Sequence, residues 1–386
     1  MEKHITLTSG PHDSENLPVS LKLEGAGKEG EVNLVDDKSA KPLPVQVERL
    51  PDNALLVTWI VPDLKAGQER AYSLYTGACG AKPASDVRLN DHAGDKLDVM
   101  IGGKLFTTYN YGARWVRPYL YPVISPGSVC VTRGFPMAPD LPGEAKDHPH
   151  HKSIWVAWGD TNGTDNWSEV EPKHGRQLHK EFGCAISGPV YGKFCATNDW
   201  VTNDRKKKDL TETRTLTFYN LPDKERIIDF VVEFKATEGA VRFGDTKEGG
   251  ICSVRVTSTM DAKAQGRIEN AYGGVNERET WGKRAHWCDY SGPAQGKPVG
   301  IAVFDTPGNF RYPTYWHVRD YGLMTANPFG LSHFWNDKTK DGSYTLPAGQ
   351  TMRFAYRIYL HPGDAAKGRV REKFLNYLFP PIIKVK

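Results

Sequence analysis

The sequence predicts an all-β protein with a small N-terminal β-sandwich, a large antiparallel β-supersandwich and a C-terminal helix. Glycine and proline are frequent, with 38 and 26 of the 386 residues, and aromatic residues reach 11%. Short stretches in which apolar and polar residues alternate recur along the chain, which is typical of half-buried antiparallel strands. The length is sufficient for a large core and for two domains.

Residues 1–80 predict the N-terminal sandwich, because short strand patterns follow one another at sandwich-like spacing. The small and polar residues 81–88 predict a linker. Residues 89–386 then form the large sandwich domain, which we expect to carry the functional site. The strand patterns of the first part are residues 5–8, 19–23, 45–47, 55–60 and 72–75.

In the large domain, alternation is clearest at residues 215–218, 254–257 and 353–360. Residues 227–234 and 299–304 are apolar on both faces, which indicates strands covered on both sides. One segment is helical in pattern. Asp364 is a candidate cap, Val370 and Phe374 recur at helical spacing, and Pro380 ends the segment.

Composition excludes several classes of protein. The net charge is only +4, from 50 basic and 46 acidic residues, so we expect no nucleic-acid partner. No segment approaches the roughly 20 apolar residues of a membrane span. The N-terminus lacks the apolar region of a signal peptide. We therefore expect either a periplasmic or secreted protein whose leader has been removed, or a cytoplasmic protein. Dinucleotide-binding, phosphate-loop, serine-elbow and His-Glu-x-x-His motifs are absent.

The six cysteines show no Cys-x-x-Cys spacing, which disfavours a zinc ribbon. Cys184 and Cys195 could close a hairpin, and the alternative is that all six are simply buried thiols.

Residues 147–169 are the densest group of reactive side chains, with His148, His150 and His151 within four positions. If residues 147–158 enter a strand, His148 and His150 share one face and His151 takes the other. That pair could bind a divalent metal with a third ligand from His174, His179, Asp160 or Glu169. The alternatives are acid–base catalysis without a required cofactor and a structural role in satisfying loop carbonyls.

The tryptophans of this segment divide into two groups. Trp155 and Trp158 suit a core strand, whereas Trp167 lies in the polar sequence Gly-Thr-Asp-Asn-Trp-Ser-Glu. An exposed indole beside acids and amides can stack on a pyranose ring, so we expect Trp167 to bind substrate, with Asp165 and Glu169 beside it.

A second polar and aromatic run covers residues 309–322, with further polar residues soon after it. Arginine with tyrosine and histidine suits anionic or hydroxylated ligands, because guanidinium groups form forked hydrogen bonds. The candidates for substrate binding are Arg133, Tyr315, Arg319, Asn327 and His333, and His317 is a candidate second acid or base.

Five motifs resemble a bacterial family of unknown function that is labelled PmoA-like or methane oxygenase PmoA (DUF6807). They are Arg-Pro-Tyr-Leu-Tyr-Pro (117–122), Val-Thr-Arg-Gly-Phe-Pro (131–136), His-Pro-His-His-Lys-Ser-Ile-Trp (148–155), Asn-Trp-Ser-Glu (166–169) and Pro-Thr-Tyr-Trp-His-Val-Arg-Asp-Tyr-Gly (313–322). The resemblance is ordered and covers nearly the whole chain. It implies a link to sugar degradation and, by analogy of fold, a galactose-mutarotase-like supersandwich.

The label itself disagrees with the sequence, because membrane methane monooxygenase subunits need several transmembrane spans. We therefore expect a carbohydrate-active lyase, hydrolase or epimerase that acts on a glycoside or an oxidised (keto) sugar. Its substrate is a small molecule or an oligosaccharide, and its catalytic residues are His150, His151, Glu169 and His317. The alternatives are a non-catalytic carbohydrate-binding protein and a metal-dependent oxygenase.

Overall fold

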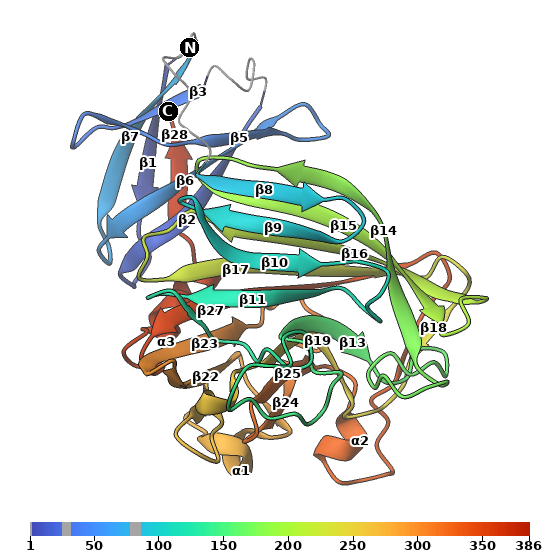
Figure 1. Ribbon diagram of the computed structural model, residues 1–386. Helices are drawn as coiled ribbons and strands as arrows, with labels where there is room; N and C mark the ends of the chain where they lie inside the picture. Colours follow the sequence, from blue (N-terminus) through green and yellow to red (C-terminus); the bar gives the residue numbers. More distant parts are fainter. Residues whose placement is uncertain (1, 25–31, 78–85) are drawn as a thin grey trace.

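Two β-sandwiches make up the protein, and the predicted all-β class is confirmed (Figure 1). The structure, a computed structural model, describes residues 2–24, 32–77 and 86–386. Within these ranges, no helix is both long enough and apolar enough to cross a membrane.

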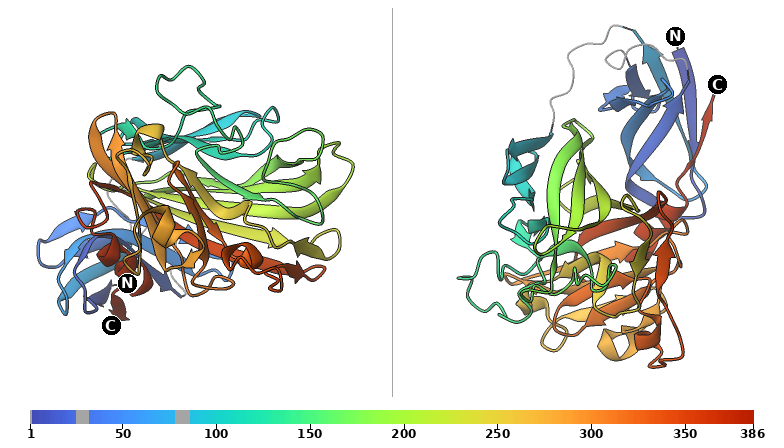
Figure 2. Two further views of the ribbon diagram at one scale, coloured as in Figure 1. Left: turned by 90° about the horizontal axis from the view of Figure 1, so that it is seen from below. Right: turned by 90° about the vertical axis from the view of Figure 1, so that its right-hand side faces the viewer.

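The N-terminal sandwich packs a five-stranded sheet on a three-stranded sheet around Ile5, Trp59 and Leu74, which are all buried. Its fifth strand comes from the other end of the chain, since β28 pairs with β1 and brings the two termini together (Figure 2). The sequence predicts no strand here and assigns these residues to the large domain of residues 89–386. Residues 81–85 of the predicted linker lie outside the described residues. The strands in sheet order are β28 (Ile382–Val385), β1 (Glu2–Thr8), β7 (Glu69–Thr76), β3 (Val32–Asp36) and β4 (Lys41–Leu43), and then β2 (Ser14–Leu23), β6 (Leu55–Leu64) and β5 (Gln46–Arg49).

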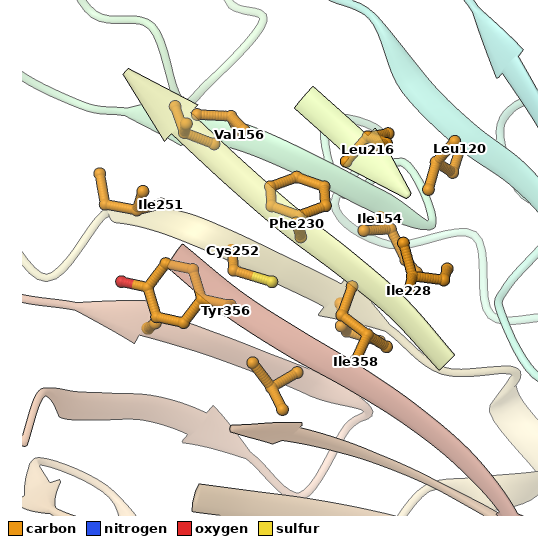
Figure 3. Close-up of a cluster of buried hydrophobic side chains, with 14 of the residues drawn as sticks. Leu120, Ile154, Val156, Leu216, Ile228, Phe230, Ile251, Cys252, Tyr356 and Ile358 are labelled. Carbon is orange, nitrogen blue, oxygen red and sulfur yellow. The ribbon is translucent and has the colours of Figure 1, made fainter. Parts of the chain in front are cut away.

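The large sandwich consists of a ten-stranded and an eight-stranded antiparallel sheet that face each other across an apolar core (Figure 3). The ten-stranded sheet has the order β21 (Lys283–Arg284), β24 (Tyr315–Arg319), β25 (Leu323–Asn327), β19 (Gly249–Arg255), β13 (Ile154–Trp158), β11 (Tyr119–Ser125), β10 (Lys104–Asn110), β9 (Lys96–Ile101) and β8 (Val87–His92), with β12 (Val129–Cys130) beside β11.

The eight-stranded sheet contains the hairpin of β14 and β15, which a disulfide between Cys184 and Cys195 joins at paired positions. Smaller elements flank the two sheets. The eight strands are β14 (Gly175–Ile186), β15 (Tyr191–Thr202), β16 (Lys208–Tyr219), β17 (Arg226–Lys235), β27 (Thr351–Pro362), β23 (Lys297–Phe304), β22 (Trp287–Ala294) and β20 (Arg267–Asn270), and the flanking elements are β18 (Val241–Phe243), β26 (Tyr344–Leu346), α1 (Asn276–Thr280), α2 (Leu331–Phe334) and α3 (Val370–Leu378).

The predicted C-terminal helix is present and covers the eight-stranded sheet, but it begins later than its sequence pattern indicates. Helix α3 starts at Val370, whereas Asp364 holds a preceding turn by accepting a hydrogen bond from the Lys367 amide at 2.9 Å. Because α3 packs over β27, most of this strand is buried on both faces rather than on one. Phe374 of α3 contacts Phe304 there.

The outward face of the ten-stranded sheet positions the site. Its register aligns His317, Thr325, Ser253, Trp155 and Tyr119 in one row across β24, β25, β19, β13 and β11. Since successive side chains of a strand point to opposite faces, the neighbours of these residues point into the core. The row is therefore covered by loops and not by the second sheet.

Candidate functional site

The histidine cluster lies on a loop that precedes β13, over the outward face of the ten-stranded sheet. The expected strand over residues 147–158 is wrong in its first half, because β13 begins only at Ile154. His148 and Ser153 have positive φ angles of 42° and 58°, and Pro149 has no amide hydrogen for a sheet. His148 and His150 therefore do not share a strand face.

Arg133 fixes the shape of this loop. Its side chain is fully buried and donates hydrogen bonds to the carbonyl oxygens of Ala145, Asp147 and His148 at 3.2, 2.8 and 2.8 Å. It also donates to the Asp147 carboxylate at 2.5 Å. Burial, and then the nearby Arg255, lower the pKa of Arg133 to about 10, which leaves it charged at neutral pH. Arg133, the predicted substrate anchor, thus uses these donors to hold the loop.

Asp147 and Arg255 hold two of the histidines by their Nδ1 atoms. Asp147 Oδ2 lies 2.6 Å from His148 Nδ1, and Arg255 donates to His151 Nδ1 at 3.1 Å and to Asp147 Oδ1 at 2.8 Å. Burial raises the pKa of Asp147, but Arg255, His148 and Arg133 outweigh it and bring this pKa down to about 2. Asp147 is therefore a carboxylate at neutral pH and accepts from His148.

These two partners give His148 and His151 opposite tautomers. A guanidinium can only donate, so His151 Nδ1 must accept and its Nε2 carries the hydrogen. Asp147 only accepts, so His148 Nδ1 carries the hydrogen and Nε2 of the neutral ring has a free lone pair. Burial, and then His150 and Arg255, lower the pKa of His151 well below its ordinary value, which keeps it neutral.

The two imidazoles are stacked. Their ring centroids lie 4.7 Å apart with an angle of 7° between the planes, and the ring of Tyr321 lies parallel to His148 at 5.0 Å. The side chain of His148 is 40% exposed, whereas His151 is 1% exposed. A ring with a lone pair, partly exposed, thus lies parallel to a buried ring that carries an N–H group.

His150 stands edge-on to this pair. Its ring centroid lies 4.4 Å from that of His151 at an angle of 79°, and it also contacts Trp167. Burial, and then Arg117 and His148, lower the pKa of His150 to about 3, so this ring is neutral at physiological pH.

Glu169, a predicted catalytic carboxylate, is bound by two buried cations. The Lys152 ammonium donates to both of its oxygens, and the Arg117 guanidinium lies 3.4 Å from Oε1. Burial raises the pKa of Glu169, but Arg117 and Lys152 outweigh this effect and lower it overall. Arg117 also donates to the carbonyl oxygens of His150 and Trp167, which ties the two loops together.

The expectation of an exposed indole at Trp167 is wrong. Trp167 is 2% exposed and packs against His151 and Trp155, with centroids at 5.2 and 5.6 Å. Asp165 forms the turn that buries it, because its carboxylate accepts from the amides of Trp167 and Ser168. The polar sequence around Trp167 reflects this turn.

The remaining predicted residues lie further along the same sheet. His317 is 2% exposed beside Trp281, and burial lowers its pKa to about 3. Arg319 forms an ion pair with Glu277 at 2.8 Å and lies 5.3 Å from the centre of the Tyr321 ring.

Three of the predicted substrate-binding residues have neighbours within the fold. Asn327 donates to the carbonyl oxygens of Thr246 and Lys247 and is buried. Tyr315 stacks on Phe334 and accepts a hydrogen bond from the Trp335 indole. His333 lines a hollow of about 410 Å³ near Trp281. They do not join the histidine loop in one cluster.

Metal binding by His148 and His150 stays a prediction. Their ring centroids are 5.7 Å apart at an angle of 73°, and His148 Nδ1 is engaged by Asp147. Among the described residues, no group of three or more His, Cys, Asp or Glu side chains is arranged to hold a metal ion. The suggested third ligand His174 is paired with Glu171.

Four residues of the cluster were not predicted as site residues from the sequence: Asp147, Arg117, Lys152 and Arg255. Asp147 directly precedes the histidines, and Arg117 and Lys152 belong to the motifs quoted above, so adjacency was an available signal. Arg255 comes from β19, 104 residues beyond His151. Only the fold brings it to the site.

Comparisons with known proteins place the chain in a family. The model of "Family of unknown function (DUF6807)" matches residues 96–374. No protein with a curated description matches. An α-mannosidase from Enterococcus faecalis V583 is similar in structure, with a TM-score of 0.47 and 9% identity over 100% of this chain and 46% of that one.

A protein in the Glycosyl Hydrolase Family 38 from Enterococcus faecalis is also similar, with a TM-score of 0.41, 10% identity and coverage of 100% of this chain and 47% of that one. This chain spans just under half the length of these two proteins. The family match covers well over half of the sequence and agrees with the motifs that first suggested it. The chain belongs to the family of unknown function DUF6807.

Proposed function

We propose that this protein is an enzyme that transfers protons on a sugar-type substrate, as a lyase or epimerase, with His148 as base and His151 as hydrogen-bond donor. The observation that carries the proposal is the pair of stacked imidazoles, with ring centroids 4.7 Å apart, whose hydrogen-bond partners assign them opposite tautomers. A base next to a hydrogen-bond donor suits removal of a proton from carbon beside a carbonyl group.

In the proposed step, His148 Nε2 takes the proton from the carbon next to the carbonyl of an oxidised sugar. The electron pair of the broken C–H bond moves to the carbonyl oxygen, and the N–H of His151 stabilises the resulting oxyanion. A lyase then expels the glycosidic oxygen, which receives the proton from His148. In an epimerase, solvent water protonates the other face of the carbon, and His148 passes its proton to the resulting hydroxide through solvent.

Hydrolysis by two carboxylates is less well supported by the same geometry. Such hydrolases use a carboxylic acid with a raised pKa to protonate the leaving group. Here Asp147 and Glu169 are both bound by cations, which lower their pKa values. Neither can hold a proton at neutral pH.

The sugar class is supported by the surroundings of His148. The Tyr321 ring stacks on His148, and Arg319, whose guanidinium lies over the Tyr321 ring, offers donors to hydroxyl or carboxyl groups. We also propose an oxidising compartment, periplasmic or extracellular, because Cys184 and Cys195 form a disulfide.

The reaction is tested in D₂O with a panel of 3-keto-glycosides and uronate-containing disaccharides. We expect NMR to show exchange of the proton beside the carbonyl, with or without elimination, and its loss in His148→Ala. His92→Ala is the matched control, because His92 also pairs with a carboxylate, Asp98, at 2.8 Å but lies elsewhere on the surface. Equal exchange by the wild type and His148→Ala refutes the proposal.

Sugar binding without any exchange supports the alternative of a non-catalytic binding protein. Purified protein that carries stoichiometric iron or copper and reacts with oxygen supports the oxygenase alternative instead.

A further inference from the structure

A cavity of about 720 Å³ lies between the turn after β8 and the hairpin of β14 and β15. Its lining includes no residue of the histidine loop, so it is separate from the proposed acid–base site. Small-molecule sites in proteins have volumes of about 300–1,000 Å³. The cavity is thus large enough for a ligand of its own.

Three rings form an aromatic group in the lining. Tyr111, His179 and Phe182 lie with centroid distances of 4.4 Å from tyrosine to histidine, 4.5 Å from histidine to phenylalanine and 5.2 Å from tyrosine to phenylalanine. The register of β14 shifts after His179 and again after Phe182, and such bulges redirect side chains. The disulfide from Cys184 holds β14 to β15 just beyond the second shift.

The polar groups of the cavity are close to one another and nearly balanced in charge. Three carboxylates and four basic side chains line it, among them Asp199 and Lys180, whose charged atoms lie 3.9 Å apart. Asp91 is fixed by a hydrogen bond from the Tyr111 hydroxyl at 2.5 Å.

We propose that this cavity is a second binding site, for a neutral saccharide. An aromatic surface suits the apolar face of a sugar ring. Hydroxyl groups both donate and accept, so they require donors and acceptors side by side, as the rim provides. Near balance of the rim charges favours a neutral ligand over an ion. The proposal does not depend on the acid–base reaction.

Binding is tested by saturation-transfer NMR on the full chain. The probes are methyl glucosides, methyl mannosides, cellobiose and maltose, with glucuronate and p-nitrophenol as anionic and aromatic comparisons. We expect at least one neutral saccharide to bind with a dissociation constant of about 1 mM or tighter. Phe182→Ala and His179→Ala should each weaken it about three- to tenfold, since each removes a ring contact.

Two controls and one further cavity variant make the result specific. Phe379→Ala removes an exposed phenylalanine outside the cavity, and His148→Ala alters only the acid–base site; both should keep the affinity. Glu181→Gln changes an exposed rim carboxylate, does not threaten folding and should weaken binding.

The proposal is overturned if no neutral saccharide binds, or if only glucuronate or p-nitrophenol does. It is also overturned if His148→Ala abolishes binding while the cavity variants retain it. Loss of the proton exchange described above leaves these outcomes unchanged, so the two proposals fail separately.

Discussion

Replacing Glu169 by glutamine is predicted to destabilise the fold, because Glu169 neutralises two buried cations. Lys152 and Arg117 are 2% and 1% exposed, and both lie against this carboxylate. Removing one partner of a buried pair costs about 3–5 kcal/mol. Glu169 retains 16% exposure, so we expect a loss near the lower end, about 3 kcal/mol at pH 7.

The loss should depend on pH through Lys152. Burial lowers its pKa from 10.5 to about 8 despite the raising effect of Glu169. Relative to a charged lysine in the unfolded chain, a charged Lys152 in the folded protein therefore costs about 3 kcal/mol of stability at pH 7. A neutral Lys152 in the folded protein would cost about 5 kcal/mol on the same scale. Without Glu169 the pKa of Lys152 falls further. Lys152 can then release its proton, so its share of the lost stability is at most about 1–2 kcal/mol. The rest comes from Arg117, which stays charged.

The sign follows from the depressed pKa. The folded state binds fewer protons than the unfolded state between the two pKa values, so stability rises with pH in that interval. The interval begins near pH 8 in the wild type and at a lower pH in the variant. The difference in the free energy of unfolding between wild type and variant should therefore decrease by up to about 1 kcal/mol from pH 7 to pH 8.

Urea unfolding at pH 7 and pH 8 measures both effects. The control is Asp52→Asn, which removes the partner of Lys22 in an exposed pair and should cost less than about 1 kcal/mol. A Glu169→Gln loss below about 1 kcal/mol, or an equal loss at both pH values, would refute the reasoning. A Glu169→Gln variant that keeps full stability but loses activity would support a catalytic role for Glu169.

Three further predictions concern other parts of the structure. Asp147→Asn should flatten the acid limb of the stability curve followed by circular dichroism, because Asp147 adds stability above pH 3.8 that is lost as the pH falls toward its folded pKa of about 2; identical acid limbs would contradict this. The double variant Cys184→Ser, Cys195→Ser should lose about 2–3 kcal/mol in urea unfolding, since the crosslink closes a short loop, and reduction of the wild type should match it. Gly250→Ala should lower Tm, because a Cβ would lie 1.3 Å from Thr325 Oγ1, and Thr325→Ala should partly restore it; an unchanged Tm in Gly250→Ala would be inconsistent with this packing.

Local patterns were sufficient to predict the strands and the approximate place of the site. Alternation at residues 215–218 matches the buried and partly exposed residues of β16, and the density of histidine pointed to the loop before β13. These signals are short-range, and they survive in the fold because one face of each strand must be buried.

Long-range pairing could not be predicted in the same way. β28 pairs with β1 across almost the whole chain, and Arg255 reaches His151 from a distant strand. The strand expected over residues 147–153 does not form, because Arg133 binds the loop carbonyl oxygens and His148 has a positive φ. The exposure expected of Trp167 is wrong because the turn formed by Asp165 has a polar sequence, whereas the indole within this turn is buried.

The tautomers of His148 and His151 can be observed directly by long-range ¹H–¹⁵N NMR, at a pH where both rings are neutral. We predict hydrogen on Nδ1 of His148 and on Nε2 of His151, with assignments from single-histidine variants. In Arg255→Met, the His151 tautomer should no longer be fixed, while the Nδ1 hydrogen of His148 should remain. Hydrogen on the same nitrogen of both rings, or a His151 that is doubly protonated at pH 7, would contradict the proposed pairing of base and donor.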